Sequence, residues 1–65
     1  MFKVEIDTDG AAFKDPNGVL DEVYEGAEIV RILRTQVIDY IVNADAFGGT
    51  LVDSNGNKVG RWWIG

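Results

Sequence analysis

The chain has 65 residues and a formal net charge of −5, with 11 acidic residues against 6 Lys and Arg and with no Cys or His. This length allows a single domain, residues 1–65, with a small core. The lack of Cys excludes disulfides and thiol chemistry, and the lack of His removes the commonest general base and transition-metal ligand. The negative charge disfavours direct binding of nucleic acid or anionic membranes and favours a basic protein surface as partner, although acidity also serves solubility alone.

Residues 1–7 predict a strand. Phe2, Val4 and Ile6 alternate with charged residues, so the apolar side chains share one face. This alternation is not the apolar run of a signal peptide, and no later apolar stretch is long enough to span a bilayer. We therefore expect a cytoplasmic protein with no membrane contact.

Residues 8–19 predict a connection. The order Asp15-Pro16-Asn17-Gly18 is typical of a β-turn. Phe13 is the large apolar residue of this segment, and we expect it to fold back onto the core.

Residues 20–42 predict a helix. Gly26 interrupts it at a cost of about 1 kcal/mol relative to Ala, which favours a short helical turn followed by a longer helix. Glu28 and Arg31 have the spacing of an ion pair. Residues at three- and four-residue spacing form the expected core stripe: Val23, Ala27, Val30, Leu33, Val37 and Ile41, with Tyr40 beside them.

Residues 50–64 predict a β-hairpin after a Gly48-Gly49 loop. Asn55-Gly56 is the pair that a type I′ turn requires, and it would place Asp53 opposite Lys58 and Val52 opposite Val59. One face, assigned to the core, carries Leu51, Trp62 and Ile64. The other face, expected to be exposed, carries Thr50, Val52, Val59, Arg61 and Trp63.

The predicted order is β-α-β-β. The expected fold class is α+β, a three-stranded antiparallel sheet with one main helix packed on one face.

Catalytic and metal-binding motifs are absent from the sequence. Paired carboxylates need a cleft that desolvates one of them, and so short a chain offers no evident cleft. The fragments 7–10 and 53–57 resemble the start of a calcium loop, but neither is followed by the Glu that closes such a loop. We expect no enzymatic activity, no cofactor and no metal.

The acidic residues concentrate early in the chain. Residues 1–28 hold eight acids and two Lys, which is −6, and residues 29–65 sum to +1. Asp21, Glu25 and Glu28 lie on one side of the predicted helix and form a row that suits a basic groove. The alternative is a solvated helix N-terminus, where acids are favoured by the helix dipole.

Trp63 is the second candidate for partner binding. The predicted register places it on the exposed face, where an aromatic side chain would anchor an interface. The alternative is a shifted register that buries Trp63 and exposes Trp62.

Three segments resemble those of small acidic phage and prophage accessory proteins. They are TDGAAF at 8–13, EIVRILR at 28–34 and LVDSNGNKVG at 51–60, and residues 19–26 look like an insertion relative to that pattern. Anti-CRISPR inhibitors of type I systems belong to this group, and some of them bind the Cas effector where DNA would enter. The resemblance implies a non-enzymatic inhibitor in a bacterial host, a monomer or weak homodimer that blocks DNA binding. Its expected partner-binding residues are Asp7, Asp9, Asp15, Asp21, Glu22, Glu25, Glu28 and Trp63.

A different function class stays open. The chain could be a structural or assembly subunit of a virion, or another protein-interaction module, joined as a dimer through Val52, Val59 and Trp63. An inhibitor that acts through charge would lose binding as salt rises, whereas an assembly subunit would oligomerise with little salt dependence.

Overall fold

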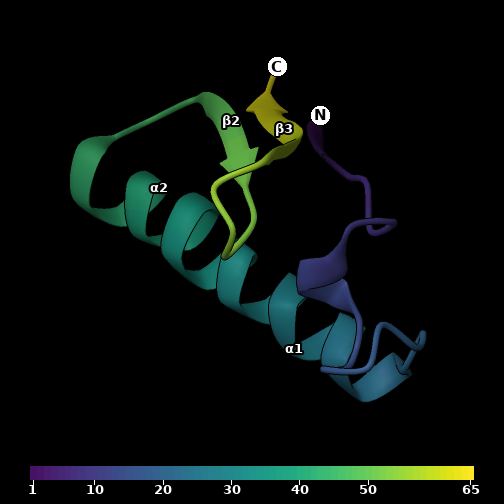
Figure 1. Ribbon diagram of the computed structural model, residues 1–65. Coiled ribbons are helices and arrows are strands. Elements are labelled where there is room, and N and C mark those ends of the chain that lie inside the picture. The colour runs from purple at the N-terminus through teal and green to yellow at the C-terminus, as the bar shows by residue number, and fades with distance from the viewer.

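The computed structural model describes residues 1–65 and forms an α+β fold of one sheet and one long helical rod (Figure 1). The sheet is antiparallel with the spatial order β1-β3-β2, so β1 and β2 are its edges. The predicted β-α-β-β order and three-stranded sheet are confirmed. The elements are β1 Phe2–Ile6, the 3₁₀ turn η1 Ala11–Phe13, α1 Glu22–Ile32, the π-helical segment η2 Leu33–Ile38, α2 Asp39–Ala44, β2 Gly48–Val52 and β3 Lys58–Ile64.

The core lies between the sheet and the helical rod. The predicted burial of Phe13, Leu51 and Trp62 is confirmed. Ile64, also assigned to the core, is instead 41% exposed. It pairs with Phe2, which is itself exposed, at an end of the sheet where no helix covers the inner face. The buried apolar residues are Phe13, Ile32, Val37, Leu51 and Trp62.

The helical rod runs from Glu22 to Ala44 without a break at Gly26. The side chain of Asp21 caps its start by accepting the Val23 N–H at 2.8 Å, and Asp45 ends it in the left-handed conformation, at φ 51°. The helix predicted over residues 20–42 is confirmed to within two residues at each end, and the predicted interruption is wrong. The extra hydrogen bonds of a continuous helix offset the cost of one Gly.

The face that the helix buries differs from the predicted one. Ile29, Ile32 and Leu33 face the core, whereas Val23 is 78% and Val30 50% exposed. The helix carries two apolar stripes, and periodicity alone does not tell which of them the sheet covers. Of the predicted stripe, Val23, Ala27, Val30 and Tyr40 are exposed, and only Leu33, Val37 and Ile41 face the core.

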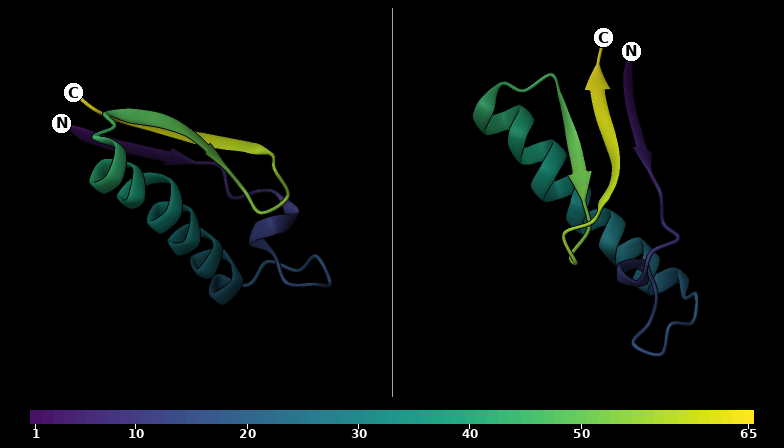
Figure 2. Two further views of the ribbon diagram at one scale, coloured as in Figure 1. Left: turned by 90° about the vertical axis from the view of Figure 1, so that its left-hand side faces the viewer. Right: turned by 45° about the horizontal axis from the view of Figure 1, so that its top comes forward.

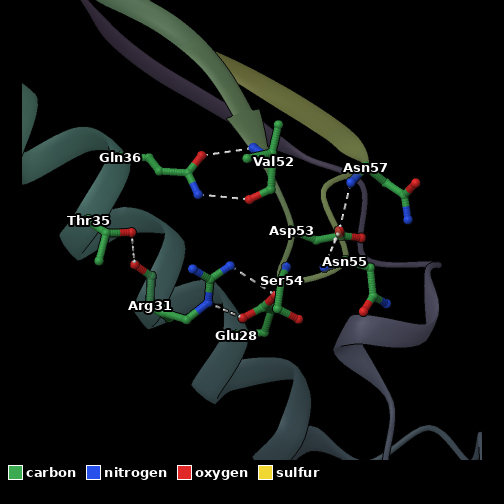
Figure 3. A network of polar contacts seen from close by, with 9 residues as sticks. All are labelled: Glu28, Arg31, Thr35, Gln36, Val52, Asp53, Ser54, Asn55 and Asn57. Atoms are coloured by element: carbon green, nitrogen blue, oxygen red, sulfur yellow. Dashed lines mark hydrogen bonds and ion pairs between the residues drawn. The ribbon is translucent and has the colours of Figure 1, made fainter.

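The π-helical segment brings the rod into contact with β2. The Asp39 N–H reaches the carbonyl of Arg34, five residues back. Within this wider turn the Gln36 amide bonds the backbone of Val52 twice, its Oε1 accepting from Val52 N and its Nε2 donating to Val52 O, both at 2.8 Å (Figure 3). A helix side chain thus takes the place of a neighbouring strand at one residue of the β2 edge.

The β2–β3 turn is not the predicted type I′ turn. Gly56 alone in this turn has a positive φ, 82°, and its N–H bonds the Asp53 carbonyl at 3.0 Å, so Ser54 and Asn55 are the central residues. Leu51 faces Gly60 as predicted, but Val52 faces Lys58, which makes Val59 the extra residue of a bulge. The predicted pairs Val52–Val59 and Asp53–Lys58 are therefore wrong.

Three glycines lie in the paired strands β2 and β3. Gly48 and Gly49 lie in β2 rather than in a loop. A Cβ at Gly60 would stand 1.8 Å from the carbonyl oxygen of Glu5, so only glycine lets β1 approach β3 at this point. Any larger residue at position 60 would force the two strands apart.

The molecule is elongated, with extents of 38 × 19 × 18 Å. Both chain ends lie together at one end, where the Gly65 N–H donates to the Met1 carbonyl at 2.9 Å. The connection from β1 to α1 lies at the opposite end, together with the β2–β3 turn (Figure 2).

Candidate functional site

The candidate site is the end of the molecule formed by residues 7–25 (Figure 2). This segment holds six carboxylates and one cation, Lys14, and the rest of the chain holds five acids and five cations. The whole net charge of −5 therefore belongs to this segment. We call it the acidic end, and its carboxylates are Asp7, Asp9, Asp15, Asp21, Glu22 and Glu25.

The carboxylates of the acidic end differ in what they bond. None of them forms an ion pair. Asp15 Oδ1 accepts the N–H groups of Asn17 and Val19, both at 2.9 Å, and so holds its own turn. The Gly18 N–H bonds the Asp15 carbonyl at 2.9 Å, which confirms the predicted β-turn. Asp7 Oδ1 accepts the Asp9 N–H at 2.9 Å, and Asp21 caps the helix. These bonds to neutral backbone groups leave the negative charge in place.

Asp9 and Glu22 are exposed, and Glu25 is half-buried. Their side chains accept no hydrogen bond from the rest of the chain, so they are the carboxylates that a partner could reach at the least structural cost. Because Glu22 and Glu25 lie in the first turn of α1, they also interact favourably with the helix dipole.

Glu28 does not belong to the acidic surface. It is 7% exposed, and its carboxylate accepts from Arg31 Nε at 2.6 Å and from the Ser54 N–H at 2.8 Å (Figure 3). The predicted Glu28–Arg31 ion pair is confirmed, but the predicted row Asp21–Glu25–Glu28 is wrong at its third member. Glu28 joins the helix to the β2–β3 turn, and its charge is neutralised there.

The Arg31 hydrogen bond lowers the pKa of Glu28, with a further contribution from the Ser54 N–H, while burial opposes both. The same contact raises the pKa of Arg31. Both shifts favour the charged forms of the pair, so the pair stays ionised around neutral pH.

Trp63 lies on the outer face of the sheet and at the other end of the molecule from the acidic end. It is half-buried and pairs with Lys3 of β1 and with Gly48 of β2. The Arg61 guanidinium lies 4.8 Å and the Lys3 ammonium 6.0 Å from its ring centroid, both in the range of cation–π contacts. The structure does not bring Trp63 together with the predicted acidic residues. Trp62 is the buried tryptophan of the two.

Asp53 and Gln36 carry structural roles that sequence reasoning missed. Asp53 is 4% exposed, and its Oδ1 accepts the N–H groups of Asn55 and Asn57, both at 2.9 Å. The turn at 15–19 has the same bonds and the same Asp-x-Asn-Gly order, with a positive φ at its Gly18. The repeat of this four-residue pattern in the sequence is the signal that would have identified both turns as one type.

Other classes of site have no structural counterpart. The structure has no pocket and no group of three or more side chains that could hold a metal ion. No helix of the chain combines the length and the apolar character that crossing a membrane requires.

The chain was also compared with known proteins. No protein-family model, no curated protein and no solved structure matches it. The roles of its residues therefore rest on geometry and charge.

Proposed function

We propose that this chain is a non-catalytic inhibitor, encoded by a phage or prophage, that binds a bacterial defence effector through its acidic end and blocks DNA binding. The first candidate partner is a Cas effector subunit of a type I CRISPR system. The observation that carries the proposal is the location of the entire net charge in residues 7–25, none of whose acids is ion-paired. Such a concentration of carboxylates complements the cationic surface with which a protein holds a phosphate backbone.

The structure changes which residues would make the contact. Glu28 is excluded as a contact because it is buried and paired. Asp9, Glu22 and Glu25 would give the main charge complementarity, with Asp7, Asp15 and Asp21 adding to the field. Trp63 would be a separate contact, because it lies away from the acidic end.

Affinity capture from a bacterial lysate that contains a DNA-binding defence complex tests this proposal. The tagged chain should retain the effector, release it as salt rises and lose it to added double-stranded DNA. The double reversal E22K/E25K should abolish capture. A chain that captures the effector equally well after this reversal would contradict the proposal.

The reversal D39K/D45K is the matched control. It changes the net charge by the same amount, but its two acids lie in or next to α2, outside the acidic end. This control should still capture the effector. Because Asp45 has a positive φ, thermal melts must first confirm that the control is folded at the assay temperature.

The virion-subunit alternative predicted a dimer through Val52, Val59 and Trp63. Val59 is half-buried against the core, and Trp63 is flanked by Arg61 and Lys3. These three side chains therefore do not form an open apolar face.

A further inference from the structure

The strand β1 presents an unpaired backbone edge. The Asp7 N–H donates to Val59 O at 2.7 Å and the Gly65 N–H to Met1 O at 2.9 Å, so odd-numbered residues at both ends of β1 bond β3. Ile64 lies opposite Phe2, but its N–H donates to the carbonyl of Phe47 and not to Phe2. In an antiparallel pair of strands, residues that bond the partner strand alternate with residues that do not. The N–H and C=O groups of Phe2, Val4 and Ile6 therefore point away from β3, toward the open edge of the sheet.

The two edge strands of the sheet differ in whether a side chain bonds their outward backbone groups. On β2, the Gln36 side chain bonds the outward N–H and C=O of Val52. No side chain bonds the outward backbone groups of β1, and no segment lies beside this strand in Figure 2. Such an edge is a template for another strand.

The sequence of β1 is complementary to itself in the antiparallel direction. A two-fold axis at Val4 would place Val4 opposite Val4 of the second copy, Phe2 opposite Ile6, and Lys3 opposite Glu5. Each residue whose backbone N–H and C=O point to the open edge would then lie opposite such a residue of the second copy. This gives three pairs that each exchange two hydrogen bonds. On the other face, two Lys–Glu pairs would form at the short distance of cross-strand neighbours.

Other registers are less favourable. An axis at Lys3 would place Lys3 opposite itself, and an axis at Glu5 would place Glu5 opposite itself, with fewer hydrogen-bonded pairs in both cases. An axis between two neighbouring residues would place each residue whose N–H and C=O point to the open edge opposite one whose groups already bond β3, so no hydrogen-bonded pair would form. Charge and backbone pairing therefore select the axis at Val4.

The surface of the monomer also favours association. The Phe2 side chain, 52% exposed, lies beside Trp62 with ring centroids 6.2 Å apart, and the Ile6 side chain of a second copy would cover it.

We propose that two copies of this chain pair through β1, in an antiparallel register centred on Val4, to form a continuous six-stranded sheet. The contact is small compared with stable interfaces, so the dimer forms in the micromolar to millimolar range. This inference is independent of the proposed function, because β1 lies outside the acidic end.

Sedimentation equilibrium of the wild-type chain and of charge variants tests the register. Both K3E and E5K should weaken association about tenfold, because each creates like-charged pairs in place of opposite ones. The double variant K3E/E5K should dimerise as the wild type does. An equimolar mixture of the two single variants should form a heterodimer, since one then offers only acids and the other only bases.

General repulsion between acidic chains gives a different result. K3E makes the chain more acidic and E5K makes it less so, and general repulsion would therefore weaken the first dimer and strengthen the second. Only specific pairing weakens both and restores the double variant. Slower exchange of the Phe2, Val4 and Ile6 amide protons at high protein concentration would locate the contact on β1.

Two outcomes would overturn the proposal. The first is a wild-type chain that stays monomeric at millimolar concentration. The second is a dimer that V30K abolishes while K3E and E5K leave it intact, because the solvent face of the helix would then be the interface.

Discussion

Carboxylates serve two purposes in this molecule, and the contrast is clearest between the buried acids near the β2–β3 turn and three acids of the acidic end. At the junction between the helix and the β2–β3 turn, Glu28 and Asp53 are buried and bonded to Arg31 and to backbone N–H groups. At the acidic end, the side chains of Asp9, Glu22 and Glu25 form no ion pair and accept no hydrogen bond from the chain. The burial and bonding partners of an acid, rather than its place in an acidic stretch, therefore decide whether it supports the fold or is free for a partner.

The largest stability effect is expected at Asp53. Replacing it with Ala removes a buried carboxylate that accepts two N–H groups of the turn, and we expect a loss of about 2 kcal/mol in the free energy of unfolding. For a chain of this size that corresponds to a fall in Tm of about 10 °C. Thermal unfolding followed by circular dichroism measures it. A change within error would show that the junction does not depend on this carboxylate.

Glu28→Gln should cost somewhat less, about 1 kcal/mol, because the amide keeps one hydrogen-bond acceptor while the ion pair with half-exposed Arg31 is lost. The wild-type effect depends on pH. The pKa of Glu28 is lower in the folded state, so its stabilisation is complete above the ordinary glutamate pKa of about 4.3 and is lost as pH falls through the folded value. Urea unfolding of both proteins between neutral and acid pH measures this, and the difference in stability should shrink with acidification. A constant difference would contradict the assignment.

Asp15→Ala isolates the effect of burial, since the Asp15 side chain accepts the same two backbone N–H bonds as that of Asp53. Water can replace the carboxylate in the more exposed 15–19 turn, so we expect a loss of about 0.5 kcal/mol. Melting the two Ala variants side by side separates the effect of burial from that of the hydrogen bonds. Equal losses would show that burial does not matter here.

Glu22→Lys should have the smallest effect on stability. The residue is exposed and bonds nothing, so only the helix dipole is affected, at a cost of about 0.5 kcal/mol. Its effect should appear in partner binding instead. A large fall in Tm for this variant would place Glu22 among the structural acids.

Much of the fold could be predicted from the sequence because its patterns are local. The alternation in residues 1–7, the apolar period of the helix and the Asn55-Gly56 turn predicted the elements and their order. Phe13 could be placed in the core because it is the large apolar residue of its segment, and Leu51 and Trp62 because the predicted hairpin put them on one face.

The rest depends on contacts between distant segments. The helix has two apolar stripes, and the sheet decides that Ile29 and Ile32 face inward while Val23 and Val30 do not. The burial of Glu28 follows from its contact with the turn between β2 and β3, where it accepts the Ser54 N–H. No local pattern shows that contact, so the acidic row was predicted with one member too many.

The most direct test of the account compares binding to the captured effector across the two regions by titration calorimetry. We expect E22K/E25K to raise the Kd at least tenfold and E28Q to leave the Kd unchanged, although each variant lowers the stability by about 1 kcal/mol. Equal Kd values for the wild-type chain and E22K/E25K would contradict it.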